Sequence, residues 1–221
     1  MSKIVQIAEL SVYNGDEEIL LENLSFTLDK GDIAQLADMT SIQYDTLFDV
    51  LTGDISPNSG QIVLADRNIV RLSPKKRKKM LREEVSFLPR EFPLPEKKTV
   101  VQALKFKLVV TEMPRDLEEH LEETLRLTGL EGERESLCRQ GEEIKKAKTR
   151  LALSIVNGPD LLVCHEPFLT LNSQEEEEIF DVLRRINEEK GLSILLLTDD
   201  LTGNFDEVRK IESNLDSRVV G

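Results

Sequence analysis

Loose alternation of apolar and polar residues in the first third of the chain predicts β-strands. Two such segments, 4–13 and 19–28, are separated by Asn14-Gly15, a dipeptide typical of the tight turn between antiparallel strands. A third strand is predicted over 61–64, after the turn residues of 57–60. The chain is therefore expected to begin with a β-rich region.

Three further runs are almost wholly apolar rather than alternating. They lie at 33–37, 161–164 and 192–198, and such runs are typical of parallel strands that helices cover on both faces. Another strand is predicted at 85–88. Because strands and helices alternate in the second half of the chain, the pattern predicts an α/β fold.

Helical periodicity and end signals predict helices over 45–52, a basic segment opened by Ser73-Pro74, 99–110, 115–127, 142–156 and 173–189. Ser73 and Ser173 are the predicted caps of their helices. The tail, 207–220, is predicted to form a small hairpin.

Composition narrows the possible classes of function. Hydrophobic residues make up 39% of the 221 residues, enough for the core of one α/β domain with lobes or at most two small domains. The formal charge of −13 disfavours a general nucleic-acid binder, because phosphate binding depends on Lys and Arg. The N-terminus lacks a signal-peptide pattern. The apolar runs are far shorter than the roughly 20 residues of a membrane span. Any membrane link is therefore expected to come through a partner.

Four segments resemble, in order and spacing, the motifs of the ATP-binding cassette (ABC) family of transporter subunits. They are Lys30-Gly31-Asp32-Ile33 before the phosphate loop, Leu51-Thr52-Gly53 with Pro57-Asn58-Ser59-Gly60-Gln61-Ile62 after it, Asn157 to Pro167 around the catalytic carboxylates, and Leu195 to Asp200 at the switch histidine. Together they extend over essentially the whole chain.

The resemblance implies a single ABC-type nucleotide-binding domain, 1–221, with a P-loop NTPase-like core, an antiparallel β subdomain and a helical subdomain. It places the β-rich and core lobe at about 1–90 and 157–221 and the helical lobe at about 91–156. Thr99-Val100, after a phenylalanine-proline loop, resembles the lipoprotein-release, macrolide-export and cell-division branch of the family.

The family's phosphate loop has the pattern G-x-x-x-x-G-K-[ST], in which the lysine and the hydroxyl hold phosphate and magnesium. Here Asp38 and Gln43 stand at the glycines, Tyr44 at the lysine, and Asp45 at the hydroxyl with Thr46 behind it. Carboxylates at a helix N-terminus compete with phosphate and repel it. These residues therefore predict a lost phosphate site, although Asp45 also suits an ordinary helix N-cap or first-turn acid.

Two other positions implied by the resemblance depart from the pattern. Arg90 stands at the glutamine that senses the γ-phosphate, in a loop that the family also uses to contact the membrane subunit; a solvated arginine is the other interpretation. Glu142, Glu143 and Ile144 replace the serine and glycines of the signature, and they suit a plain helix start.

His165 stands at the magnesium aspartate and Glu166 at the general base. A lone histidine is a weak sign of a metal site, so we favour a structural or interface role for His165 and predict no metal. Glu166 is expected to be idle, because no substrate is positioned for it. Asn172 stands at the aspartate of the dimer loop and Asp199 at the switch histidine. Tyr13 matches the aromatic that stacks on adenine, or is simply a tyrosine at a strand end.

In this family two cassettes share each ATP site, and the substitutions affect both halves. We therefore expect a non-catalytic pseudo-ATPase that acts as a scaffold or coupling subunit, cytoplasmic and peripheral on the inner face of a membrane. Its expected partners are an integral permease-like subunit and a second cassette, with no nucleic acid. No cofactor is expected, and binding of ATP and magnesium is expected to be weak or absent.

Two other hypotheses stay open: a divergent active ATPase that uses Glu166 with Lys145 or Lys148, and a soluble interaction module. The basic run 75–79 is predicted to be a solvated helix face, with attraction to a membrane surface as the second interpretation.

Overall fold

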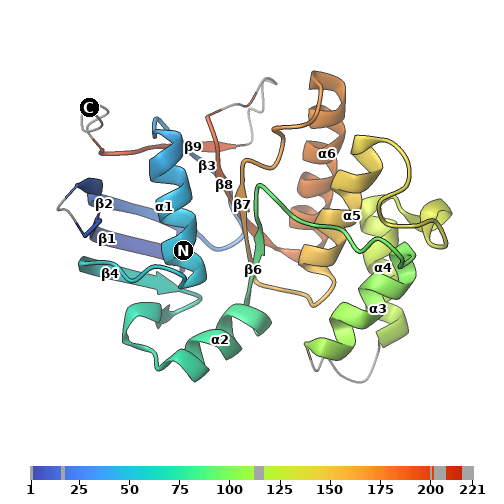
Figure 1. Cartoon of the computed structure of the whole chain (residues 1–221), viewed down its shortest axis with the longest axis horizontal. Helices are drawn as coiled ribbons and strands as arrows, with labels where there is room; N and C mark the ends of the chain where they lie inside the picture. The colour runs from blue at the N-terminus through green and yellow to red at the C-terminus, as the bar shows by residue number, and fades with distance from the viewer. Residues whose placement is uncertain (1, 16–17, 112–116, 200, 202–207, 216–221) are drawn as a thin grey trace.

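The computed structural model describes residues 2–15, 18–111, 117–199, 201 and 208–215. An antiparallel sheet, ordered β2-β1-β4-β5, forms one side of the molecule (Figure 1). Its strands are β1 (Lys3–Tyr13), β2 (Ile19–Asp29), β4 (Ser59–Leu64) and β5 (Arg67–Asn68). The Asn14 N–H donates to the Glu18 carbonyl at 3.0 Å, and β1 pairs antiparallel with β2, as the Asn-Gly turn predicts.

A second sheet, ordered β6-β7-β8-β3-β9, runs through the centre of the molecule, and its paired neighbours are parallel. Its strands are β6 (Val85–Leu88), β7 (Leu161–His165), β8 (Ser193–Leu197), β3 (Ile33–Ala37) and β9 (Arg209–Glu212). Every residue of β3, β7 and β8 is buried, which confirms that the three apolar runs are parallel strands covered on both faces.

Helices cover both faces of this parallel sheet (Figure 1). They are α1 (Ser41–Thr52), α2 (Pro74–Glu83), α3 (Val100–Val110), α4 (Leu117–Thr128), α5 (Glu143–Ile155) and α6 (Ser173–Lys190), with short 3-10 turns η1 (Ile69–Arg71) and η2 (Glu131–Glu133). The helix α1 lies between the two sheets, and α5 and α6 lie on the opposite face of the parallel sheet. None of the helices within the described ranges combines the length and apolar character needed to cross a membrane.

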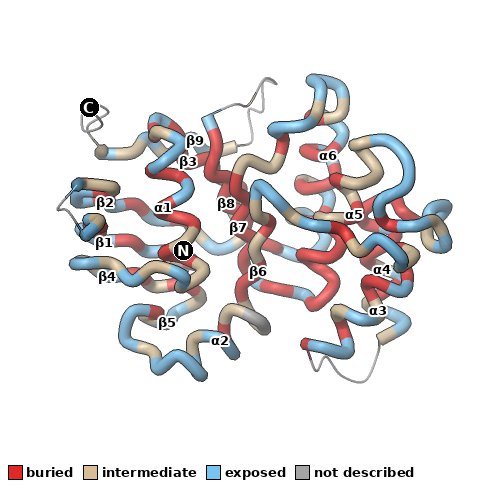
Figure 2. The backbone as a smooth tube through the Cα atoms, viewed as in Figure 1, coloured by how far each residue is buried: buried red, intermediate tan, exposed pale blue. Residues whose placement is uncertain are grey.

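Successive residues of the central strands pack into different clusters, as the two-residue period of a strand requires. Leu161 and Val163 of β7 face α1 and the antiparallel sheet, whereas Leu162 and Cys164 face α5 and α6. A third cluster joins α3, α4 and part of α5. The buried segments in Figure 2 follow the central strands and the inward faces of these helices. This core fixes the positions of the loops at the ends of the strands.

The predicted start of α1 is wrong by four residues, because Thr40 rather than Asp45 caps the helix. The Thr40 hydroxyl accepts from the Gln43 N–H at 3.3 Å, and the Gln43 side-chain oxygen accepts from the Thr40 N–H at 2.8 Å. This reciprocal capping box begins the helix at Ser41. Asp45 therefore lies beyond the first turn and is neither a cap nor a first-turn acid.

The cap of α6 is corrected, and the tail forms a strand in the parallel sheet. Asn172, not Ser173, caps α6: its side-chain oxygen accepts from the N–H groups of Gln174 and Glu175, both at 3.1 Å. In the tail, Arg209–Glu212 forms β9, which pairs parallel with β3, a pairing that the predicted hairpin does not include. The remainder of the predicted hairpin after 215 lies outside the described residues.

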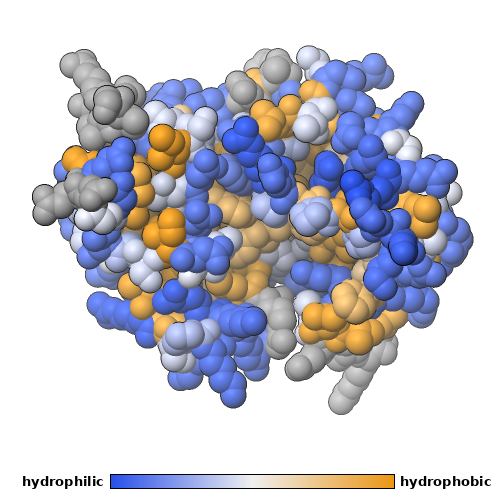
Figure 3. All heavy atoms as spheres, in the orientation of Figure 1, coloured by the Kyte–Doolittle hydropathy of each residue, from blue (hydrophilic) through white to orange (hydrophobic). Residues whose placement is uncertain are grey.

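The surface of α3 is unusual because three large apolar side chains of this helix are exposed. Phe106 is 57% exposed, Val109 65% and Val110 53%. Figure 3 shows a gathering of hydrophobic side chains at this edge of the molecule. The Lys98 ammonium lies over the Phe106 ring, 4.9 Å from its centroid. We call Phe106, Val109 and Val110 the α3 apolar patch.

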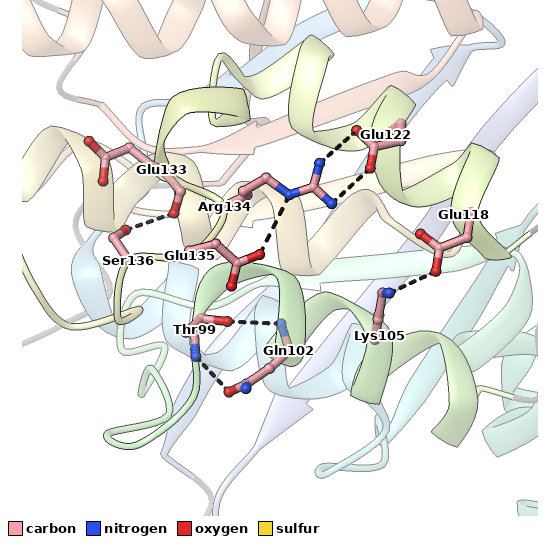
Figure 4. Close-up of polar contacts among 9 residues, drawn as sticks. All are labelled: Thr99, Gln102, Lys105, Glu118, Glu122, Glu133, Arg134, Glu135 and Ser136. Carbon is pink, nitrogen blue, oxygen red and sulfur yellow. Dashed lines mark hydrogen bonds and ion pairs between the residues drawn. The ribbon is translucent and has the colours of Figure 1, made fainter.

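Polar contacts connect α3 and α4 to the turns around them (Figure 4). Thr99 and Gln102 form a capping box that begins α3 as predicted from 99–110. Lys105 of α3 pairs with Glu118 of α4 at 2.7 Å, and Arg134 pairs with Glu122 of α4 at 3.0 Å. Because these pairs are exposed, each contributes little to the stability of the helical region.

Candidate functional site

The candidate site lies at the carboxyl ends of three adjacent strands. In the order β7-β8-β3, these ends carry His165 and Glu166, then Asp199, then Asp38. Ligand sites of open α/β sheets form at this edge of the sheet. The sheet therefore brings together residues that the sequence separates by up to about 160 positions, which is the separation of Asp38 and Asp199.

Tyr44 is bonded into this edge rather than pointing at a ligand. Its side chain is buried, and its Oη lies 3.0 Å from the Leu36 carbonyl and 2.8 Å from Asp199 Oδ1. The Asp38 N–H donates to the same Asp199 oxygen at 2.7 Å. Burial first, and then the hydrogen bond to Asp199, raises the pKa of Tyr44 above its ordinary value of 10.0. Tyr44 is therefore a neutral phenol that holds the start of α1 to the end of β8.

Asp38 keeps the backbone conformation that a glycine would suit. Its φ of 62° is in the left-handed region, which Asp tolerates better than most residues. Its carbonyl accepts from the Ser213 hydroxyl at 2.8 Å, and its carboxylate lies 3.4 Å from the Lys210 ammonium. These contacts from the segment around β9 hold Asp38 in place. Sequence reasoning missed Lys210 and Ser213, because no pattern in the tail signals a parallel strand.

His165 and Asp45 form a second contact across this edge. The His165 Nε2 lies 3.1 Å from Asp45 Oδ1, and its ring stacks on Phe48 with centroids 5.0 Å apart. Burial lowers the pKa of His165 below its ordinary value. The Asp45 carboxylate raises this pKa, and the positive charge of Arg90 lowers it further. His165 is thus a buried, packed ring whose Nε2 contacts the exposed carboxylate of Asp45.

Glu166 sits on a strained turn directly after β7. Its φ is 48°, its N–H donates to the Leu197 carbonyl at 3.1 Å, and its carboxylate accepts from the Thr198 hydroxyl at 3.3 Å. The side chain lines a cleft of about 430 Å³ between the 89–93 loop, α5 and α6. Arg90 lines the same cleft, so the structure brings these two predicted residues to one space.

In the family motif, a lysine and a hydroxyl hold the phosphates and the magnesium of the nucleotide. Between Asp38 and Thr46 there is no lysine or arginine. The Thr46 hydroxyl, which stands next to the motif's hydroxyl position, donates to the Ile42 carbonyl at 2.7 Å within the helix. These side chains do not fit a magnesium triphosphate held in the manner of the family motif.

The structure does not bring the other predicted residues to this group. Glu142 begins α5 without a side-chain capping bond, Glu143 pairs with Lys146 at 2.7 Å, and Ile144 packs against the cluster of α5 and α6. Tyr13 ends β1 and is 37% exposed. Asn172 caps α6. Within the described residues, no cluster of three or more His, Cys, Asp or Glu side chains is arranged to hold a metal.

Solved ABC cassettes share this architecture. The chain matches the structure of CbiO1 from Clostridium perfringens, part of the ABC transporter complex CbiONQ, with a TM-score of 0.81 and 23% identity over 90% of this chain and 80% of that one. It matches the dimeric bacterial cassette MJ0796 with a TM-score of 0.77 and 17% identity over 94% of both chains. These likenesses confirm the predicted α/β fold with its antiparallel sheet, parallel sheet and helices.

Curated relatives are named as ATP-binding proteins. The methionine import ATP-binding protein MetN of Geobacillus kaustophilus is 28% identical over 91% of this chain, and MetN 2 of Enterococcus faecalis is 26% identical over 82%. The chain spans 57% and 52% of the lengths of these two relatives.

The expectation of no cofactor, with weak or absent binding of ATP and magnesium, is wrong. The curated relatives are ATP-binding proteins by name, and a post-hydrolysis structure of the MJ0796 cassette is bound to ADP and phosphate. The altered side chains of the phosphate loop therefore do not justify the conclusion that nucleotide is excluded. Assignment to the lipoprotein-release branch stays a prediction.

The family model described as "ABC transporter" matches residues 21–169. This range contains the phosphate-loop segment, the helical region and the end of β7, and it covers more than half of the chain. The collinear motifs, the two-sheet architecture and this match lead to one assignment: the chain belongs to the ABC transporter family.

Proposed function

We propose that this chain is a non-catalytic ATP-binding subunit of an ABC system, which couples or scaffolds a membrane permease and a second cassette on the inner, cytoplasmic face of the membrane. The observation that carries the proposal is the bonding of Tyr44 to Asp199 and Leu36 at the position of the motif's lysine. The proposal concerns ATP hydrolysis only. It does not exclude nucleotide binding, which the names of the relatives imply.

Hydrolysis needs more than a general base. Phosphoryl transfer depends on cations that neutralise charge and on groups that align the attacking water. Glu166 stands at the base position, but Tyr44 is neutral and Asp199, at the switch position, accepts from both Tyr44 and Asp38. The groups that would assist Glu166 are thus engaged in holding the loop.

The second half of a shared site is altered as well. In the geometry that the resemblance implies, the segment at the start of α5 would face the nucleotide of the partner cassette. Here Glu142 and Glu143 bring carboxylates, and Glu143 is paired with Lys146. A partner with intact motifs would therefore meet an acidic segment where it needs N–H and hydroxyl donors, so pairing does not restore turnover.

The α3 apolar patch supports a protein partner. Monomeric proteins seldom expose several large apolar side chains together, and such patches mark interaction sites. Here Phe106, Val109 and Val110 are all exposed on one helix. We assign the patch to the permease-like partner. With it we propose the division into a core lobe at 1–90 and 157–221 and a helical lobe at 91–156, because α3, α4 and α5 share an apolar cluster.

The two alternatives have less support. An active enzyme that substitutes Lys145 or Lys148 would need these cations near the phosphate loop. The Lys145 ammonium instead donates to the Leu137 and Gln140 carbonyls, and Lys148 pairs with Glu178. A soluble interaction module would place a soluble protein on the α3 apolar patch, whereas membership of the ABC transporter family favours a permease.

The test is ATP turnover by the assembled complex, purified from solubilised membranes with its permease. Phosphate release should be no greater than in the Glu166→Gln complex, and binding of a fluorescent ATP analogue, measured separately, should be present in both. Steady phosphate release that Glu166→Gln abolishes would show an active ATPase. Purification without any integral membrane protein would favour the soluble module.

A further inference from the structure

One segment of this acidic protein is entirely free of acidic residues. From Arg67 to Arg82 the sequence holds eight lysines and arginines and no aspartate or glutamate, in a chain with 42 acidic and 29 basic residues. The segment comprises β5, η1 and most of α2. Such segregation creates a local positive field on a molecule whose formal charge is −13.

The packing of α2 turns its lysines outward. Met80 is fully buried, and Arg77 lies over the end of α1, where its Cδ would be 3.1 Å from a Cβ added at Gly53. These two residues anchor the helix. Among the described side chains of the segment, Arg67 is exposed but pairs with Glu84. The other exposed basic residues are Arg71, Lys75, Lys76, Lys78 and Lys79, which we call the α2 basic patch.

The patch has little internal neutralisation. The ion pair between Lys79 and Glu83 is long, at 3.9 Å, with Lys79 68% exposed. Val70, which is 37% exposed, precedes Arg71 at the edge of the patch. Four of the five cations are lysines, which act as flexible point charges rather than as shaped, bidentate ligands. The arrangement suits a broad anionic surface better than a single phosphate in a pocket.

The position of the patch indicates which surface this is. In Figure 1, α2 and α3 lie along the same edge of the molecule, and α3 carries the apolar patch assigned to the permease. This step rests on the proposed function, since contact with a permease would turn that edge toward the bilayer. The acidic first turn of α6, with Glu175 and Glu176, lies on a different side. Because charges farther than about 8 Å from the bilayer are screened at physiological salt, the cations on the edge that faces the bilayer interact with it most strongly.

We propose that the α2 basic patch binds the anionic phospholipid headgroups of the membrane beside the permease. Each basic residue near an anionic bilayer increases partitioning by about fivefold. A patch of five such residues gives measurable binding of the isolated chain, and the attraction weakens as salt shortens the Debye length. The position of the patch on the same edge as the α3 apolar patch favours a bilayer over a nucleic acid as the occupant.

The experiment is co-sedimentation of the purified full chain with vesicles, without permease or nucleotide. Binding is expected to vesicles of phosphatidylcholine with 30 mol% phosphatidylglycerol at low salt, and not to phosphatidylcholine alone. The variant with Lys75, Lys76, Lys78 and Lys79 each changed to Gln should lose more than about tenfold in partitioning. Glutamine keeps the helix propensity close to that of lysine, and circular dichroism checks the fold.

A matched control removes four cations elsewhere. Lys30, Arg126, Arg184 and Lys190 have exposed side chains in surface ion pairs, and changing each to Gln lowers the charge by the same amount. This control should keep vesicle binding to within a few fold. Equal losses in both variants would make the effect one of net charge and overturn the proposal.

Two other results would overturn it. The first is no binding of the unmodified chain to the anionic vesicles at any salt. The second is binding of a DNA duplex through the four lysines without vesicle binding, which would make the patch a nucleic-acid interface. Neither result depends on ATP turnover, so the proposed function and this inference can fail separately.

Discussion

At the phosphate-loop end of the candidate site the substituted side chains bond to one another, whereas at the start of α5 they bond to surface neighbours. Tyr44 is buried and bonded to Asp199, which also accepts from the Asp38 N–H. Glu143 is half-exposed and pairs with Lys146 within its own helix. The first segment has gained a structural role in place of the motif's chemistry, while the second has become an ordinary helix start.

This difference predicts that substitutions at the phosphate-loop end lower the free energy of unfolding more than substitutions at the start of α5. A residue bonded into the edge of the parallel sheet stabilises the fold, so its removal costs free energy of unfolding. A residue in a solvated ion pair contributes little. Five substitutions and one control test the comparison.

Tyr44→Ala should have the largest effect. It removes a fully packed aromatic ring, and such truncations lower the free energy of unfolding by about 3–5 kcal/mol. Urea denaturation of the variant measures the loss. Tyr13→Ala is the matched control, since Tyr13 is 37% exposed, and it should cost less than about 1 kcal/mol. Equal costs would remove the distinction between a buried and a surface tyrosine.

Tyr44→Phe keeps the ring and removes its hydroxyl, so it should cost about 1–3 kcal/mol. The raised pKa of Tyr44 adds a pH signature. Because the unfolded chain releases this proton near pH 10 and the folded chain holds it longer, stability is full below about pH 10 and falls above it. The variant should lose part of this alkaline fall, measured by denaturation at pH 8 and 10.5. An unchanged fall would show that Tyr44 ionises in the folded protein.

The strands around this network were predictable because long apolar runs are a local signal. The runs 33–37 and 161–164 identify β3 and β7 without any knowledge of their neighbours. By contrast, the bond between Tyr44 and Asp199 joins residues 155 positions apart, and it depends on strand order and rotamers that no local pattern gives. Sequence placed both residues in the site but gave no indication that they bond.

Two local errors have different causes. The sequence contains the signal for the start of α1, because Thr40 and Gln43 have the spacing of a capping box. The prediction began the helix at Asp45 instead. The parallel strand β9 could not be predicted from the sequence, because Arg209–Glu212 is mostly charged and exposed. Backbone pairing with β3 holds this strand. Apolar runs in the sequence therefore predict the strands in the centre of a sheet well and those at its edge poorly.

His165→Gln should have an intermediate effect, about 1–2 kcal/mol at pH 7, since it removes a buried ring stacked on Phe48. The pKa of His165 is lowered in the folded state, so the unfolded chain binds the proton first. Stability is therefore full above about pH 6.5 and falls as the pH drops through the folded pKa. Denaturation at pH 7.5 and 5.5 should show a smaller difference for His165→Gln than for the unmodified chain. An identical difference would mean that other groups cause the acid loss.

The smallest effect is expected for Glu143→Ala, and its comparison with Asp45→Ala is the closest test of the two segments. Both carboxylates are about half-exposed, at 41% and 53%, and each has a basic partner at 2.7 or 3.1 Å. The partners differ: the flexible Lys146 side chain is 24% exposed, whereas the His165 side chain is 7% exposed and would lose its contact with Asp45. Glu143→Ala should therefore cost less than about 0.5 kcal/mol and Asp45→Ala about 1–2 kcal/mol, in urea denaturation at pH 7.5. If the two costs coincide, the contact between Asp45 and His165 stabilises the fold no more than a surface pair, and the phosphate-loop end depends on Tyr44 alone.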